Sequence, residues 1–169
     1  MDTIIACRYN GGVIIAADSA QARSILIYKD DLDKIHEISE NVIMGQAGPN
    51  SDVVSFGEYV EKNLKLYQLG NDGRSMSTKS AANFVRGELA KALRKGPYQT
   101  NIMLGGFDEG KGESLYYVDY MGTLQVSARR SRGSSLSSSW AANFVIFSTH
   151  THSTSLALLG GQFRSAGVR

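Results

Sequence analysis

Histidine and cysteine are the side chains that most often act as bases, nucleophiles or metal ligands, and this sequence has few of them. Cys7 lies in an apolar run, where a cysteine is usually a small core side chain. His36 lies in a predicted strand, and His150-Thr151-His152 lacks a third ligand at a spacing typical of zinc sites. The sequence also has no GxSxG elbow, HExxH helix, CxxC pair or phosphate-binding glycine loop. These patterns therefore predict no catalytic, metal or cofactor site.

The composition is that of a globular protein, with 42% hydrophobic and 20% charged residues in a chain of 169. No apolar run reaches the roughly 18 residues that a membrane-spanning helix needs. Asp2 is acidic, whereas a secretory signal begins with basic residues. We therefore expect a folded protein of the cytoplasm and nucleus.

The distribution of charge changes near residue 125. The last acidic residue is Asp119, whereas arginines continue to the C-terminus. Residues 127–139 are rich in Ser and Arg, and no sustained hydrophobic period follows them. We expect residues 1–125 to form one domain and residues 126–169 to be a divergent tail that is disordered or poorly ordered. An Arg/Ser segment can also bind RNA, which stays open as an alternative.

The first fifty residues have the pattern of β-strands. Thr3–Tyr9 and Val13–Ala17 are apolar runs that flank Asn10-Gly11-Gly12, which predicts a tight hairpin buried on both faces. Further short apolar runs, bounded by charged, Ser/Asn or Gly residues, predict strands at Ile25–Tyr28, Ile35–Ile38 and Val42–Gln46.

The hydrophobic period then becomes helical. Apolar residues recur at spacings of three and four between Val53 and Tyr67, which predicts a helix of about five turns. Asn50 or Ser51 is expected to cap its start. Gly70 is expected to end it in the left-handed conformation, which glycine adopts at low cost.

A second helix and two more strands are predicted after it. Ser77 is the expected N-cap of this helix, and Gly96-Pro97 closes it. Asn101–Phe107 and Ser114–Tyr120 flank a glycine-rich turn and suit paired antiparallel strands. Strands, two helices and strands in this order predict an α+β layered domain and not alternating βαβ units.

Several segments resemble the β subunits of the proteasome. The stretch from Gly11 to Ser19, GGVIIAADS, resembles the hairpin that opens these subunits. Other segments follow in the family's order and resemble its beta-4 type, which is called beta type-2 in animals: Lys29–Lys34, Phe56–Val60, Leu66-Tyr67, Ala81–Phe84, Pro97–Gln99 and Leu115–Tyr120.

The resemblance covers residues 1 to about 125 and implies a fold. That fold is the four-layer αββα sandwich of the N-terminal-nucleophile hydrolases, in which helices cover both outer faces of two antiparallel sheets. From Val126 onward no segment resembles the strands and helices that complete it. The resemblance therefore implies that the C-terminal half of the fold is truncated or replaced.

The resemblance also implies a site without its nucleophile. Active members use a threonine at the mature N-terminus, whose hydroxyl attacks the peptide carbonyl and whose α-amine is the base. Aligned on the hairpin, Asp2 stands at that position, while Asp18, Lys34 and Gly48 match the rest of the active pattern. The simpler interpretation is that Asp18 and Lys34 form an internal ion pair and Gly48 permits a tight turn. Trimming that exposes Thr3 would leave a threonine one residue out of register.

The implied function is architectural. The resemblance implies a non-catalytic component of the 20S core β ring, which supports ATP- and ubiquitin-dependent protein degradation. Its partners would be other β subunits and α subunits of this hetero-oligomeric core, with no cofactor, nucleic acid or membrane. Three alternatives stay open: an active threonine protease subunit, a variant that cannot assemble, and RNA binding through the tail.

Overall fold

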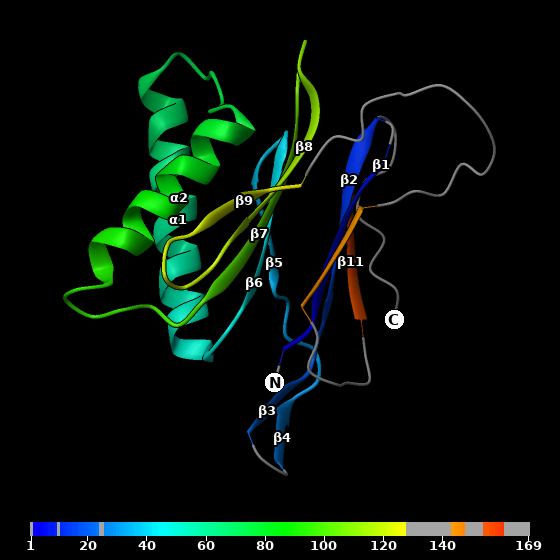
Figure 1. Ribbon diagram of the computed structural model, residues 1–169, viewed down its shortest axis with the longest axis vertical. Coiled ribbons are helices and arrows are strands. Elements are labelled where there is room, and N and C mark those ends of the chain that lie inside the picture. The colour runs from blue at the N-terminus through cyan, green and yellow to red at the C-terminus, as the bar shows by residue number, and fades with distance from the viewer. Residues whose placement is uncertain (1, 10, 24–25, 128–142, 148–153, 161–169) are drawn as a thin grey trace.

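The computed structural model describes residues 2–9, 11–23, 26–127, 143–147 and 154–160. Two β-sheets pack against each other, and a pair of helices covers the outer face of one sheet (Figure 1). One apolar cluster lies between the helices and the sheet, and a second lies between the two sheets. The described residues thus form three layers of an α+β fold, as the order of elements predicts.

The sheet that carries the helices has the strand order β5-β6-β7-β8-β9 and is antiparallel throughout. The middle strands are buried by a layer on each side, and β6 is buried along its whole length. Pairing of β7 with β8 confirms the predicted hairpin, whereas β9 is a short strand that the sequence does not predict. Their bounds are β5, Ile35–Ser39; β6, Val42–Ala47; β7, Asn101–Asp108; β8, Gly112–Val118; and β9, Leu124–Val126.

The second sheet has the strand order β10-β1-β2-β11. Its centre is the predicted hairpin of β1 (Ile4–Tyr9) and β2 (Gly12–Asp18), which the pairing confirms. β10 (Asn143–Phe147) and β11 (Thr154–Gly160) pair antiparallel along its two edges.

These two outer strands lie in the stretch for which the sequence predicts no regular element. Each is a short apolar run, and the edge of an existing hairpin offers it a row of unpaired backbone groups. The Ser/Arg-rich composition around these two strands makes them hard to recognise from the sequence. The remainder of the tail lies mostly outside the described residues, so the division at residue 125 and the poor order of the tail stay predictions.

The first helix, α1 (Asn50–Gly70), buries the predicted stripe that includes Phe56 and Val60. Its start differs from the prediction, because the N-cap is Pro49 and not Asn50 or Ser51. The carbonyl oxygen of Pro49 accepts the N–H groups of Asp52 and Val53, both at 3.0 Å. No side-chain cap is made at this end.

The end of α1 also differs from the prediction. Gly70 is still helical, and the left-handed residues are Asp72, with φ of 53°, and Gly73, with φ of 77°. The carbonyl oxygen of Gln68 accepts both the Asn71 and Gly73 N–H groups. The chain therefore reverses after Gly70 and not at it.

The second helix, α2 (Thr78–Ala92), begins as predicted, because the Ser77 hydroxyl accepts the N–H of Ser80 at 3.3 Å. A second cap comes from the sheet. Asp108, the last residue of β7, accepts the Thr78 N–H at 3.0 Å and the Thr78 hydroxyl at 3.0 Å. This carboxylate fixes the start of the helix against the strand that follows it in sequence.

Glycines let the two sheets approach closely. A Cβ on Gly105 of β7 would lie 2.5 Å from Cγ1 of Val13, and one on Gly45 of β6 would lie 2.9 Å from Cγ2 of Ile15. Both partners belong to β2 and are fully buried. The distance between the sheets is therefore set by glycine backbone on β6 and β7 and by the branched side chains of Val13 and Ile15 on β2.

One hairpin stands apart from both sheets. Within the described part of the chain, β3 (Gln21–Arg23) and β4 (Leu26–Lys29) pair only with each other, and they extend beyond the end of the sandwich (Figure 1). The sequence predicts β4 to within a residue, but not β3. Among the described residues, neither helix has the length and apolar character needed to cross a membrane.

Candidate functional site

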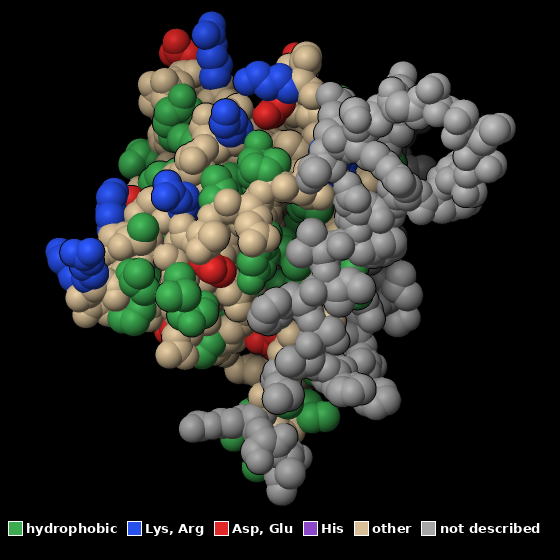
Figure 2. Space-filling model, in the orientation of Figure 1, with side chains coloured by type: hydrophobic (Ala, Val, Ile, Leu, Met, Phe, Trp, Pro, Cys, Tyr) green, Lys and Arg blue, Asp and Glu red, His purple; other side chains and the backbone are tan. Residues whose placement is uncertain are grey.

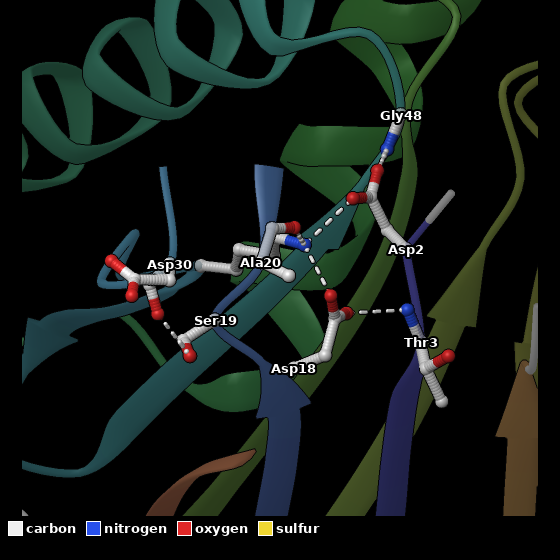
Figure 3. Close-up of polar contacts among 8 residues, drawn as sticks. Asp2, Thr3, Asp18, Ser19, Ala20, Asp30 and Gly48 are labelled. Atoms are coloured by element: carbon white, nitrogen blue, oxygen red, sulfur yellow. Dashed lines mark hydrogen bonds and ion pairs between the residues drawn. The ribbon is translucent and has the colours of Figure 1, made fainter. Parts of the chain in front are cut away.

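Lys34 is the centre of a buried polar network near the end of the sandwich. It precedes β5 and is only 2% exposed. Its ammonium donates to Asp2 Oδ1 at 2.7 Å, to Asp18 Oδ2 at 2.8 Å and to the carbonyl oxygen of Ala20 at 2.8 Å (Figure 3). A lysine ammonium has three N–H donors, so these contacts use all of them.

Asp2 bridges this ammonium and a backbone donor. Its Oδ1 accepts from Lys34, and its Oδ2 accepts the N–H of Gly48 at 3.0 Å. The Asp2 side chain is 18% exposed, so the carboxylate is mostly withdrawn from water. The start of the described chain is thereby tied to the turn between β6 and α1.

Asp18 ends β2 and anchors the network from the second sheet. Its Oδ2 pairs with Lys34, which confirms the predicted ion pair, and its Oδ1 accepts the Thr3 N–H at 2.6 Å. The Asp18 N–H in turn donates to the Thr3 carbonyl oxygen at 3.0 Å. The Ala20 carbonyl is a partner that the sequence does not single out, and Thr3, which the sequence suggests only as an alternative nucleophile, takes part in these contacts through its backbone atoms.

Gly48 is required by the packing of its turn. A Cβ at this position would lie 2.2 Å from the carbonyl oxygen of Gln99, which is too close for any side chain. The turn can therefore pass beside Gln99 only as glycine, and in doing so it presents its N–H to Asp2. This geometry agrees with the predicted tight turn between strand and helix.

The network forms part of the wall of a cavity of about 760 Å³. Asp2, Lys34 and Gly48 lie on its lining together with Tyr28 of the β3–β4 hairpin and Ser51 of α1. Asp2 and Lys34 are the charged residues of this lining, and they are paired with each other. The cavity therefore has a mainly uncharged wall of mixed polar and apolar groups.

The arrangement joins these residues by ion pairs and hydrogen bonds. The Gly48 N–H is a backbone donor of the kind that stabilises an oxyanion, but it donates to the Asp2 carboxylate. A carboxylate in this place supplies no hydroxyl and no terminal amine. The structure thus brings together all four residues that the sequence singles out, Asp2, Asp18, Lys34 and Gly48, and it joins them by charge and hydrogen bonds.

The other candidate groups lie elsewhere. Cys7 is on β1, and partial burial raises the pKa of its thiol. His36 is on the edge strand β5, and His150 and His152 fall outside the described residues. Within the part of the chain that the structure describes, no group of His, Cys, Asp and Glu is placed to hold a metal ion.

Sequence comparison relates the chain to proteins of known family. The pattern of the family described as "Proteasome subunit" matches residues 1–138. The chain is 47% identical to proteasome subunit beta type-2-B of Arabidopsis thaliana over 124 residues, which cover 73% of this chain and 62% of that protein. It is 48% identical to proteasome subunit beta type-2 of Dictyostelium discoideum over 128 residues, covering 74% and 64%.

A relative from a fungus is named beta type-4, whereas the two relatives above are named beta type-2. The chain is 40% identical to proteasome subunit beta type-4 of Saccharomyces cerevisiae over 125 residues, covering 73% of this chain and 63% of that protein. The chain thus spans a little under two thirds of the length of these relatives. The matched part contains α1, α2, β1 to β9 and the whole Lys34 network, and on this match the chain belongs to the proteasome subunit family, as one of its β-type members.

Proposed function

We propose that the chain is a non-catalytic, structural subunit of the β ring of the 20S proteasome core. In this role it supports ATP- and ubiquitin-dependent protein degradation in the cytoplasm and nucleus. Its partners are other β subunits and α subunits of the core. The single observation that supports the proposal most is the Asp2 carboxylate, which is held between the Lys34 ammonium and the Gly48 N–H.

The physical reason is that this carboxylate occupies the groups that a nucleophile would need. Threonine catalysis needs a hydroxyl and an α-amine on one residue, together with donors that stabilise the developing oxyanion. Here the ammonium and the backbone donor are both directed at Asp2. The network is consistent with a site that links the N-terminal strand to the rest of the subunit.

An active subunit with Thr3 as nucleophile is the competing proposal. Thr3 lies next to the network, since its N–H donates to Asp18. However, Asp2 and not Thr3 accepts from both Lys34 and Gly48 in the contacts described above. An electrophilic probe that forms an adduct with the hydroxyl and amine of an N-terminal threonine separates the two proposals. We expect it to label active subunits of the same particle and to leave this chain unlabelled, and an adduct on Thr3 would establish an active subunit.

Membership of the core is tested by assembly. The tagged chain is expressed with the other core subunits of its source, and the 20S-sized fraction is isolated by sedimentation. Mass spectrometry of that fraction should find peptides from residues 1–125 and from residues 126–169. A chain found only in light fractions or in aggregates would instead be a family product that cannot assemble.

RNA binding through the Arg/Ser segment of residues 127–139 stays an alternative prediction. Residues 128–139 lie outside the described part of the chain. The same sedimentation experiment addresses it, because ribonuclease treatment should leave the position of the chain in the gradient unchanged.

A further inference from the structure

The β3–β4 hairpin exposes a run of large apolar side chains. Leu26, Ile27 and Tyr28 of β4 are 59%, 68% and 62% exposed. Successive side chains of a strand point to opposite faces, so both faces of this hairpin present apolar groups to solvent. Hydrophobic side chains are visible on the hairpin at the lower end of the molecule (Figure 2).

Such a hairpin gains little by itself from its apolar residues. An isolated two-stranded hairpin is marginally stable in water, and among the residues that the structure describes β3 and β4 pair only with each other. Contiguous exposed apolar groups of this kind commonly mark an interaction surface. The hairpin is therefore a surface that a partner would stabilise.

The root of the hairpin is nevertheless held in one orientation. Where the chain enters it, the Ser19 hydroxyl donates to the Asp30 carbonyl oxygen at 2.7 Å, and the Ser19 carbonyl oxygen accepts the Leu32 N–H at 2.9 Å. One residue further, the Ala20 carbonyl oxygen accepts from the buried Lys34 ammonium at 2.8 Å (Figure 3). A surface that is fixed before binding loses less entropy on association.

From these observations we propose that the β3–β4 hairpin docks into an apolar groove on a neighbouring proteasome subunit, and that the Lys34 network holds it in the docking orientation. This inference rests on the proposed membership of the core. It gives the polar network a role in assembly in place of one in catalysis.

Size argues for a neighbour in a larger assembly and not for a second copy bound by this hairpin alone. An aromatic side chain buries about 150–250 Å² when fully enclosed, and Leu and Ile are smaller, so the exposed parts of these three side chains supply at most on the order of 400 Å². A stable pair needs about 800 Å² from each partner. The hairpin is thus sized to be one contact among several, as in a subunit that touches its neighbour over a wider surface.

Charge argues for a protein groove and not for a membrane surface. Lys29, Asp30 and Asp31 follow the apolar run and are exposed, and Lys29 and Asp31 form an ion pair at 3.4 Å. Adjacent carboxylates oppose binding to anionic lipids. An apolar centre with a charged rim is the usual anatomy of a protein–protein interface, so the groove is expected to be apolar with polar edges.

The direct test is a photo-crosslink from within the assembled particle. Tyr28→benzoylphenylalanine is introduced into the full chain, and particles that contain the chain are purified and irradiated. We expect crosslinked peptides that join residue 28 to another core subunit. Crosslinks only to a second copy of this chain, or none to any other subunit in particles that contain it, would overturn the inference while leaving core membership intact.

A pair of variants at Ile27 measures the contribution to assembly. Ile27→Glu should reduce incorporation into particles by about tenfold, which corresponds to about 1.4 kcal/mol, whereas Ile27→Val should stay within about twofold of the unaltered chain. The melting temperature of the isolated Ile27→Glu chain should be unchanged, because Ile27 is 68% exposed and contributes little to the chain's own core. Equal incorporation of both variants would refute docking, and failure of the unaltered chain to enter particles would refute core membership as well.

Discussion

Lys34 and Asp18 form an ion pair with a nitrogen–oxygen distance of 2.8 Å, and their side chains are only 3% and 5% exposed. Taking both charges out of water costs free energy, which the pair, the Asp2 carboxylate and the Ala20 carbonyl together offset. Removing the cation would leave two carboxylates in poor contact with water. The stability of the subunit should therefore depend strongly on this single lysine.

Lys34→Met tests this dependence. We expect the free energy of unfolding to fall by about 3–5 kcal/mol, because the variant leaves the buried Asp18 carboxylate without its cationic partner. Urea unfolding followed by circular dichroism measures the loss. Lys62→Met is the matched control, since Lys62 pairs with Glu58 on the exposed face of α1 with side chains 72% and 56% exposed. A Lys34→Met chain as stable as the control would show that the network contributes nothing to folding.

The close approach of the two sheets leads to a second prediction. Gly105→Ala should destabilise the fold by about 1–3 kcal/mol, because the new methyl group would overlap Val13. Val13→Ala creates room there, so the double variant should be more stable than the sum of the two single changes predicts. Thermal melts of all three variants give the coupling. Gly87→Ala on α2, where a Cβ would meet nothing within 4 Å, is the control and should not destabilise.

The cap of α2 gives a third prediction. Asp108→Ala leaves the N–H and hydroxyl of the buried Thr78 without their acceptor and should cost about 1–2 kcal/mol. Asp108→Asn keeps one acceptor oxygen in place and should cost less. Chemical denaturation measures both. An equal loss in the two variants would mean that the negative charge, and not the hydrogen bonds, fixes the start of the helix.

Cys7 provides a fourth prediction, which concerns pH. Burial raises the pKa of its thiol, so at a given pH the folded chain holds less thiolate than the unfolded chain. Alkylation by iodoacetamide should therefore be slower in the native protein than in urea, and the midpoint of its rate against pH should be higher. Any contribution of the thiol to stability is present below the unfolded pKa and is lost as pH rises through the folded pKa. Equal midpoints in the two states would contradict the burial of Cys7.

Most of the architecture of the first 125 residues follows from local pattern. Alternating and continuous apolar runs locate β1, β2, β5 and β6 because burial on a sheet face has a clear period. The stripe from Val53 to Leu64 locates α1 for the same reason. The ends of α1 are less predictable, because Pro49 and Gln68 satisfy the terminal groups through carbonyl oxygens that any residue has.

The strands that the sequence does not predict are short or depend on distant parts of the chain. β3 and β9 are each three residues long and have no period to detect. β10 and β11 are stabilised by the edges of a hairpin more than a hundred residues away, so composition alone does not reveal them. Family resemblance is what identifies the site residues, because the spacing of Asp2, Asp18, Lys34 and Gly48 alone does not group them.

The Lys34 network also bears on the order in which the chain folds. The charged and hydrogen-bonding members of the network all precede the first helix. They are Asp2, Asp18, Ala20, Lys34 and Gly48. Synthesis proceeds from the N-terminus, and the loops that these contacts close are short. All the partners of Lys34 are therefore synthesised before α1, and they leave the ribosome before β7 does. The network can close on the growing chain and hold β2, the hairpin root and β6 in place while β6 awaits its pairing with β7.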